Sequence, residues 1–337
     1  MARPTDNPPN RFHATHIEWD DEAPEATLEV FEETARSILS DNDSPDIPFR
    51  WSLNPYRGCS HACAYCYARP THPYLGFGAG TDFDRKIVVK RNAAALLRQT
   101  FERPAWRGEK IMFSGNTDCY QSVEGRYRIT RACLEVCVAY RNPVFVLTKG
   151  SLVRRDVDLL GALASIGAAS VGLSIPFADD DNRRKVEPWA ASIPQRFETL
   201  RALTAAGIPT AVSVAPVIPG LNDNDVARVL EQSYEAGARR AFMMPLRLPG
   251  EVAAVWDARM AEAFPQRVKR MESALVQVRR GRRDEARFGL RMQGEGPRWE
   301  IVTQLFHATC KRLGMNLPRE EAVPSPFRRP GEQGQLF

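Results

Sequence analysis

Residues 49–67 read FRWSLNPYRGCSHACAYCY, a short strand-like run followed at once by three cysteines. Three residues separate Cys59 from Cys63, and two separate Cys63 from Cys66. No fourth cysteine lies nearby, because the next one in the chain is Cys119. Thiolates are soft ligands that suit zinc, copper(I) and iron–sulfur clusters. The stretch therefore predicts a metal centre just after a strand, with one ligand position that cysteine does not fill.

The rest of the chain alternates between strand and helix patterns. Near-continuous apolar runs, which suit strands buried on both faces of a parallel sheet, occur at residues 49–54, 110–115, 143–150, 169–176, 209–218 and 240–246. Helical patterns lie between them, at residues 92–102, 130–140, 155–167, 194–207 and 223–237. Several of these end at a glycine shortly before the next strand, which is a usual helix stop. The sequence therefore predicts an α/β fold, a partial (β/α)6 barrel similar to a TIM barrel, with its working residues where the strands end.

The chain of 337 residues is predicted to have three parts. Residues 1–48 form an N-terminal extension, partly disordered, in which only residues 26–39 show a helical pattern. Residues 49–250 form the barrel, and residues 251–337 form a helical extension, with helices over 251–314, and a polar tail. The sequence shows no secretory signal pattern and no run of the ~18 apolar residues that a membrane span needs. We therefore expect a cytoplasmic protein, in which thiols stay reduced.

Zinc is the main alternative to an iron–sulfur cluster. A structural zinc site takes four ligands, so His61 or His72 would have to join the cysteines. A zinc-stabilised nucleic-acid-binding module would then use the basic segment 266–292, which contains Arg279, Arg280, Arg282 and Arg283. That segment also carries acidic residues, and the net charge of +5 is modest, so a solvated surface is its more usual role. The C-x3-C-x2-C spacing itself suits three corners of a cubane better than one ion.

A [4Fe–4S] cluster held by three cysteines has one iron without a protein ligand. The stretch CSHACAYC (59–66) resembles the signature of radical S-adenosylmethionine (SAM) enzymes, with Tyr65 as its aromatic residue. Further stretches, among them SGNTDCYQSVE, PVIPGLND and LRLPGEV, resemble the branch related to spore photoproduct lyase, over about residues 45–300. The resemblance implies that Cys59, Cys63 and Cys66 hold a [4Fe–4S] cluster and that SAM chelates the open iron. It also implies that SAM is cleaved to a 5′-deoxyadenosyl radical, with electrons from a low-potential donor such as flavodoxin or ferredoxin.

The same resemblance implies which other residues meet SAM. The strand-two motif that contacts the SAM amine corresponds to Ser114, Gly115, Asn116 and Thr117. Lys149, after the third strand, is a candidate partner of the SAM carboxylate or of the substrate, and Ser174 is expected to meet the ribose. Arg184 lies in an Arg-x-x-Glu-Pro stretch that includes Glu187, and its guanidinium could bind the SAM carboxylate bidentately. A solvated run of charge is the alternative interpretation for Arg184.

One departure from the branch concerns a hydrogen donor. Spore photoproduct lyase carries a cysteine immediately before a Thr-Ser-Asp stretch, at the place where this chain has Gly115–Asn116 ahead of Thr117–Asp118. Cys119 lies a few residues later and does not align, so it is either a catalytic hydrogen donor or a small buried residue. The departure favours a substrate other than a thymine photoproduct, and lyase-type repair of DNA is the alternative.

Overall fold

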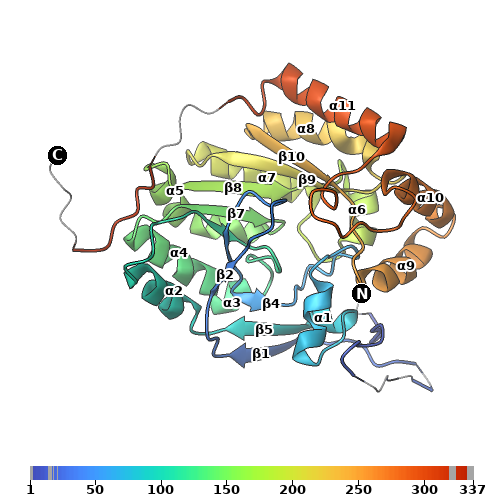
Figure 1. The fold of residues 1–337 in the computed structure, drawn as a ribbon, viewed down its shortest axis with the longest axis horizontal. Coiled ribbons are helices and arrows are strands. Elements are labelled where there is room, and N and C mark those ends of the chain that lie inside the picture. Colours follow the sequence, from blue (N-terminus) through green and yellow to red (C-terminus); the bar gives the residue numbers. More distant parts are fainter. Residues whose placement is uncertain (1–2, 14–16, 18, 21, 319–323, 332–337) are drawn as a thin grey trace.

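The computed structural model of the chain describes residues 3–13, 17, 19–20, 22–318 and 324–331. Its main sheet has seven strands in the order β10-β9-β8-β7-β6-β3-β2, and the six from β3 to β10 run parallel (Figure 1). These six are β3 (Trp51–Leu53), β6 (Ile111–Phe113), β7 (Val144–Thr148), β8 (Ala169–Ser174), β9 (Thr210–Val217) and β10 (Arg240–Pro245). They coincide with the six predicted apolar runs, so the predicted α/β fold is confirmed. The described strands form an open sheet, with β2 and β10 at its edges, and no closed barrel.

Helices carry the chain back between the parallel strands. The main ones are α2 (Ala93–Glu102), α4 (Ile129–Ala139), α5 (Val157–Ala164), α7 (Ile193–Ala205) and α8 (Val226–Glu235). Shorter elements are α1 (Thr81–Arg85), α3 (Glu124–Tyr127), α6 (Asp180–Val186) and the 3-10 turns Arg69–Thr71, Pro73–Leu75, Ser151–Asp156 and Asp223–Asp225. Gly237, which follows α8, has φ +104°, and a Cβ there would lie 2.5 Å from the side chain of Thr204. Only glycine fits this helix stop.

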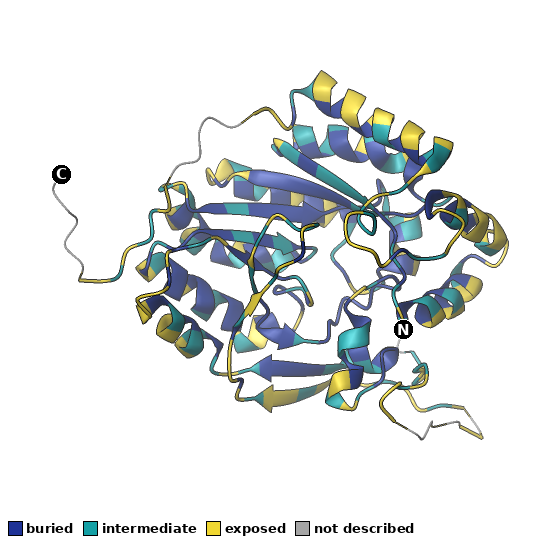
Figure 2. Ribbon diagram, in the orientation of Figure 1, coloured by how far each residue is buried: buried dark blue, intermediate teal, exposed yellow. Residues whose placement is uncertain are grey.

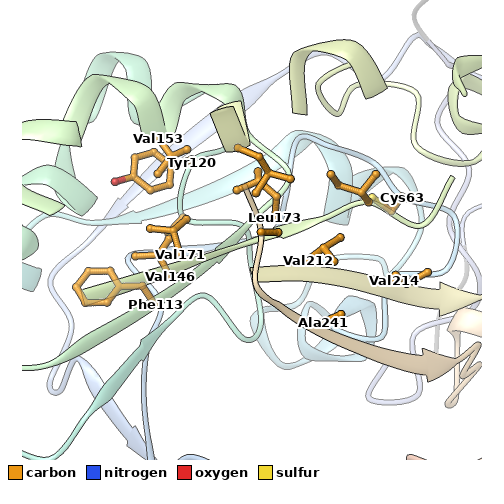
Figure 3. Close-up of a cluster of buried hydrophobic side chains, with 14 of the residues drawn as sticks. Cys63, Phe113, Tyr120, Val146, Val153, Val171, Leu173, Val212, Val214 and Ala241 are labelled. Carbon is orange, nitrogen blue, oxygen red and sulfur yellow. The ribbon is translucent and has the colours of Figure 1, made fainter. Parts of the chain in front are cut away.

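The core packs against the parallel strands. Residues paired in register point to the same face of a sheet, so they form continuous apolar rows across it. Two buried rows, labelled in Figure 3, contain Phe113, Val146 and Val171, and Leu173, Val212 and Ala241. Figure 2 shows the strands mostly buried and the helices exposed on their outer faces. This packing fixes the ends of the strands, from which the candidate site residues project.

The N-terminal segment forms strands, and the helix predicted over residues 26–39 is wrong. β1 (Glu29–Glu33) pairs parallel with β5 (Lys86–Lys90), and β5 pairs antiparallel with β4 (Tyr56–Arg57), which gives a second, three-stranded sheet. β2 (Leu39–Asp41) pairs antiparallel with β3. The apolar run of β5 offers a partner strand, and this tertiary pairing overrides the local helical spacing. The partial disorder predicted for this extension falls in part on residues 1–2, 14–16, 18 and 21, which lie outside the described residues.

Three helices follow β10, as predicted for residues 251–314. They are α9 (Val252–Ala263), α10 (Val268–Val278) and α11 (Gly296–Leu313). α11 packs against α8, and α9 packs against α6. None of the helices built from the described residues has the length and hydropathy to cross a membrane. Much of the predicted polar tail, residues 319–323 and 332–337, lies outside the described part of the chain.

Candidate functional site

The loops after the first three parallel strands are bonded to one another at the carboxyl edge of the sheet. Asn54, just past β3, accepts hydrogen bonds from the amides of Asn116 at 2.9 Å and Thr117 at 3.3 Å. Asp118 accepts hydrogen bonds from Thr148 Oγ1 at 2.6 Å and from the amide of Lys149 at 2.7 Å. Parallel strands end at the same edge of a sheet, so residues far apart in sequence meet there. The segments predicted to form the site therefore contact one another.

The cysteine loop, residues 58–68, is held in place by its backbone. The amide of Cys59 donates to the carbonyl of Phe83 at 2.9 Å, and the amide of Ala64 donates to the carbonyl of Val186 at 2.9 Å. Gly58 has φ +75°, and a Cβ there would lie 2.9 Å from the Phe83 carbonyl oxygen. A side chain at this position would push the loop away from α1, so the glycine is a requirement of the loop.

The three thiols of the loop are free and lie within electrostatic range of one another. Cys59 and Cys63 are buried, and Cys66 is partly exposed. Burial raises the pKa of the Cys59 thiol, and Asp118, Cys66 and Cys63 raise it further. Among the described residues, no three His, Cys, Asp or Glu side chains are arranged to hold a metal ion. Cys63 and Cys66 likewise act on each other's charge, so the three thiols form one group.

Both histidines that a zinc site would need have other partners. His61 Nδ1 lies 3.3 Å from Asp118 Oδ2, and His72 Nε2 lies 2.9 Å from the carbonyl oxygen of Lys86. Burial lowers the pKa of His72 to about 4. Burial alone would raise the pKa of Asp118, but His61 and the hydrogen bonds described above lower it overall. His61 and His72 therefore each have a polar neighbour inside the protein, although Nδ1 of both rings is buried without a hydrogen-bond partner among the described residues.

Three buried charged residues, the ionic frame, support the cysteine loop. Asp84 in α1 pairs with Arg69 at 2.7 Å and also with Arg259 of α9. Arg69 donates to the carbonyl of Cys63 at 2.8 Å, and Arg259 donates to the carbonyl of Ala62 at 2.7 Å. Arg69, Asp84 and Arg259 are only 0%, 2% and 5% exposed. The C-terminal helices are therefore joined directly to the cysteine loop, which the sequence analysis did not predict.

A second buried charged group surrounds Tyr65. The Tyr65 hydroxyl donates to Glu187, which also pairs with Arg196 of α7. Lys149 Nζ lies 3.9 Å from Glu187 Oε1 and 5.6 Å from the centroid of the Tyr65 ring. Arg196 also donates to the carbonyl of Ser174, at the end of β8, at 2.8 Å. The structure thus brings the predicted residues Tyr65, Lys149 and Ser174 together around one carboxylate.

Arg184 is not part of this group. It is exposed on α6, and none of the contacts described for the chain joins it to the other predicted site residues. Its neighbour Arg183 is buried and donates to the carbonyls of Glu187 and Ala190, at 2.9 and 3.1 Å. The phase of this short helix turns Arg183 inward and Arg184 outward. The buried cation that binds the Glu187 carboxylate is Arg196.

The sequence does contain a signal for the missed arginines. Arg196 shares one face of α7 with the buried residues Leu200 and Leu203. Arg259 is buried next to Met260 and shares a face of α9 with Val255. An arginine on the apolar stripe of a helix has to find a buried partner, because burying an unpaired charge is very unfavourable. This pattern would have identified both residues.

The turn at residues 114–117 has an unusual backbone. Ser114 and Gly115 have φ values of +79° and +138°. Ser114 Oγ accepts a hydrogen bond from the amide of Cys119 at 3.1 Å, and the hydroxyl of Tyr67 donates to the carbonyl of Gly115. Thr117 Oγ1 is buried and has no hydrogen-bond partner among the described residues. Buried polar groups are nearly always paired, so Thr117 is well suited to bind a ligand.

Cys119 lies in the apolar core. Its side chain is 0% exposed, and its carbonyl accepts a hydrogen bond from Thr130 Oγ1 at 2.6 Å. Burial raises the pKa of its thiol, and Asp118 raises it further. A hydrogen donor has to touch its substrate, and the described structure does not expose this thiol, so the catalytic role considered for Cys119 stays a prediction. The alternative interpretation, a small buried residue, agrees with the structure.

The chain is similar to known proteins. The family model described as the radical SAM superfamily matches residues 53–232, from the end of β3 into α8. This chain belongs to the radical SAM superfamily. An uncharacterized protein of Mycobacterium tuberculosis (strain H37Rv) is 42% identical over 226 residues, which is 66% of this radical SAM protein and 66% of the relative. A radical SAM Nalpha-GlyT isomerase of Pseudomonas phage M6 is 24% identical over 262 residues, which is 76% of this chain and 52% of the relative.

Solved structures resemble the whole radical SAM fold described above. Spore photoproduct lyase complexed with dinucleoside spore photoproduct matches with a TM-score of 0.59 and 15% identity, over 85% of this chain and 80% of that one. A mutant of the same lyase with bound AdoMet and the dinucleoside matches with a TM-score of 0.59 and 14% identity, at the same coverage. Similarity at this level of identity shows a common fold, which agrees with the predicted branch.

Proposed function

We propose that this radical SAM enzyme holds a [4Fe–4S] cluster on Cys59, Cys63 and Cys66 and binds SAM at the iron that has no protein ligand. When bound, the two groups supply a 5′-deoxyadenosyl radical, which abstracts hydrogen from an organic substrate. One observation carries the proposal. The three thiols lie within electrostatic range of one another on the loop that follows β3 and β4, inside the segment that the radical SAM family model matches.

The chain around the thiols fits these two groups. The turn at residues 114–117 offers its backbone and the unpartnered Thr117 hydroxyl to the amino end of SAM. Lys149 offers a cation for the carboxylate of SAM, and Ser174 offers a small hydroxyl for the ribose. These roles follow from the family resemblance and from the closeness of the segments described above.

The protein itself holds and orients the two groups and keeps water away from them. The ionic frame fixes the carbonyls of Ala62 and Cys63, so the cysteine loop keeps one conformation. Glu187 accepts a hydrogen bond from Tyr65, which fixes the orientation of that ring. Burial of Cys59 and Cys63 keeps water from most of the loop. Such preorganisation on a rigid scaffold is what a site for a reactive intermediate requires.

Single cysteine variants test the cluster assignment. Cys59→Ala, Cys63→Ala and Cys66→Ala should each lose the iron that anaerobic reconstitution gives the wild type. Cys133→Ala should keep it, because Cys133 lies in α4 and is 0% exposed in the core. The reduced wild type should also form 5′-deoxyadenosine from SAM without substrate, as measured by chromatography. Full iron in Cys63→Ala, or its loss in Cys133→Ala, would overturn the assignment.

The electron that cleaves SAM requires a low-potential donor, and we infer one of the flavodoxin or ferredoxin type. We place this chemistry in the cytoplasm, where the thiols stay reduced. A purified flavodoxin with its reductase should replace dithionite in the 5′-deoxyadenosine assay. Activity with dithionite and none with a panel of such donors would contradict this part of the proposal.

We infer a substrate other than a DNA photoproduct. In the basic segment, Arg279 is buried and donates to backbone carbonyls, Arg280 pairs with Glu295, and Arg283 pairs with Asp257. These contacts engage side chains that DNA phosphates would require. Cys119 does not align with the hydrogen-donor cysteine of the lyase, and its thiol is buried, which also favours another substrate. Recovery of thymine from photoproduct-bearing DNA would support lyase-type repair instead.

A further inference from the structure

Arg247 lies at the carboxyl edge of the sheet without a strong hydrogen-bond acceptor. It follows β10, the last parallel strand, and is partly buried. Among the described residues, its guanidinium forms one hydrogen bond, which is a weak bond from Nη1 to Met292 Sδ at 3.9 Å. Its Nε is buried and has no partner there. A guanidinium has five donors, and a buried donor without an acceptor destabilises the folded state, so the arrangement requires an explanation.

The acids near Arg247 form no ion pair with it. Asp284, Asp46, Arg291 and Tyr67 are the ionisable groups that act on its charge. Asp46 accepts from Arg291 Nε and from a backbone amide, both at 2.6 Å. Asp284 accepts from a backbone amide at 3.2 Å. No carboxylate of the described residues forms an ion pair with Arg247, so its fork of donors is open to an external anion.

Arg247 belongs to the same edge of the sheet as the cysteine loop. Tyr67, the residue after Cys66, is 51% exposed, and its hydroxyl donates to the carbonyl of Gly115. The loop after β10 approaches the segment after the cysteines, because a Cβ on Gly250 would lie 3.7 Å from Pro70 Cγ. Tyr67 bonds to the turn at residues 114–117 and lies within electrostatic range of Arg247, which places the arginine near the proposed SAM site.

The backbone that carries Arg247 is fixed by Arg279. Arg279 Nη2 donates to the carbonyl of Pro245 at 3.0 Å, and its Nε donates to the carbonyl of Leu246 at 3.0 Å. Its Nη1 donates to the carbonyls of Arg291 and Gln293, at 3.0 and 2.9 Å. The buried Arg279 side chain thus anchors residues 245–246, which precede Arg247, and residues 291–293, which include its neighbour Met292. This anchoring preorganises Arg247 to bind a ligand.

We propose that Arg247 binds an oxyanion of the substrate, a phosphate or a carboxylate, through its planar fork of donors. The proposal rests on the proposed function, because it adds substrate recognition to the site at which SAM is cleaved. The exposed ring of Tyr67 offers a flat surface for the part of the substrate next to the anion. The substrate class is then a compound whose charged group reaches Arg247 while the reacting carbon lies toward the cysteine loop.

The test measures anion binding without relying on turnover. The full-length protein is titrated into inorganic phosphate in one experiment and into acetate in a second. Binding is followed by the ³¹P relaxation of phosphate and by the ¹³C relaxation of acetate. We expect the preferred anion to bind Arg247→Met at least about tenfold more weakly than the wild type, and Arg247→Lys to lie between them. Arg282→Met, which removes an exposed arginine from the same C-terminal region, should bind within about twofold of the wild type. Circular dichroism verifies that each variant is folded.

The outcomes separate this proposal from the proposed function. Unchanged anion binding in Arg247→Met, or an equal loss in Arg282→Met, would overturn the anion site. A tenfold loss of SAM affinity in Arg247→Met, measured on the reconstituted protein, would assign the arginine to the cofactor and overturn the substrate role. If the wild type forms no 5′-deoxyadenosine but anion binding depends on Arg247, the anion site stands and the proposed function fails.

Discussion

Replacing Asp84 should destabilise the protein more than any surface charge change. Its carboxylate serves two buried cations, Arg69 and Arg259, and asparagine would leave both facing each other without a counter-charge. Removing one partner of a buried ion pair costs about 3–5 kcal/mol of folding free energy. We expect about 5 kcal/mol for Asp84→Asn, and about 3 kcal/mol for Arg259→Met, which leaves the pair of Asp84 with Arg69 intact. The double variant should lose less than the sum, because both changes act on one network.

Urea unfolding of the cluster-free protein measures these free energies. The matched control is Arg283→Met, because the Arg283–Asp257 pair is 38% and 49% exposed at its side chains. Arg283→Met should lose less than about 1 kcal/mol of folding free energy. Arg259→Met should also take up iron more slowly than the control during reconstitution, since the Ala62 carbonyl loses its donor. An Asp84→Asn variant within about 1 kcal/mol of the control would refute the reasoning, as would iron uptake by Arg259→Met at the control rate.

Three further predictions concern single positions. Burial lowers the pKa of His72 from 6.5 to about 4, so the folded state binds fewer protons there than the unfolded state. Stability should therefore fall as the pH drops from about 6.5 to about 4, by up to ~3 kcal/mol, and urea unfolding of His72→Gln should show a flatter pH dependence over that range. Glu187→Gln should lose about 3 kcal/mol in the same assay, because two buried cations lose their carboxylate, whereas the exposed Glu198→Gln should lose almost nothing. Cys119→Ala should cost about 1 kcal/mol and keep wild-type formation of 5′-deoxyadenosine, and a large loss of that product would give Cys119 a role at the site after all.

The parallel sheet could be predicted because its strands are buried on both faces. Such strands are near-continuous apolar runs, and glycines such as Gly237 mark where helices stop. The small sheet of β1, β4 and β5 could not be predicted in this way. β1 carries three acidic residues among its five and shows no strict alternation, so only its partner β5, more than fifty residues later, makes it a strand.

In the candidate site, too, some features could be predicted from the sequence and others could not. The cysteine spacing is local, so the motif could be recognised from the sequence alone. Arg259 and Asp84 are 175 residues apart, and no local pattern links them. Arg183 and Arg184 are adjacent in sequence, and only the orientation of a seven-residue helix decides which of them is buried. The sequence therefore identified the cysteine segment but not the buried charges that hold its backbone.

The open sheet has a consequence for how the two edges of the sheet are held together. In a closed barrel, strand number and stagger set the circumference through backbone hydrogen bonds. Here the two edges are joined by side chains, since Arg279 connects the end of β10 to the carbonyl of Arg291, and Arg291 binds Asp46 at 2.6 Å, shortly after β2. One ion pair and two hydrogen bonds, from the amide of Gly289 to Asp46 and from Arg291 to Ser44, thus take the place of a strand ladder at this seam. Widening the site at this seam would break these contacts between side chains and loop backbone, but it would separate no paired strands.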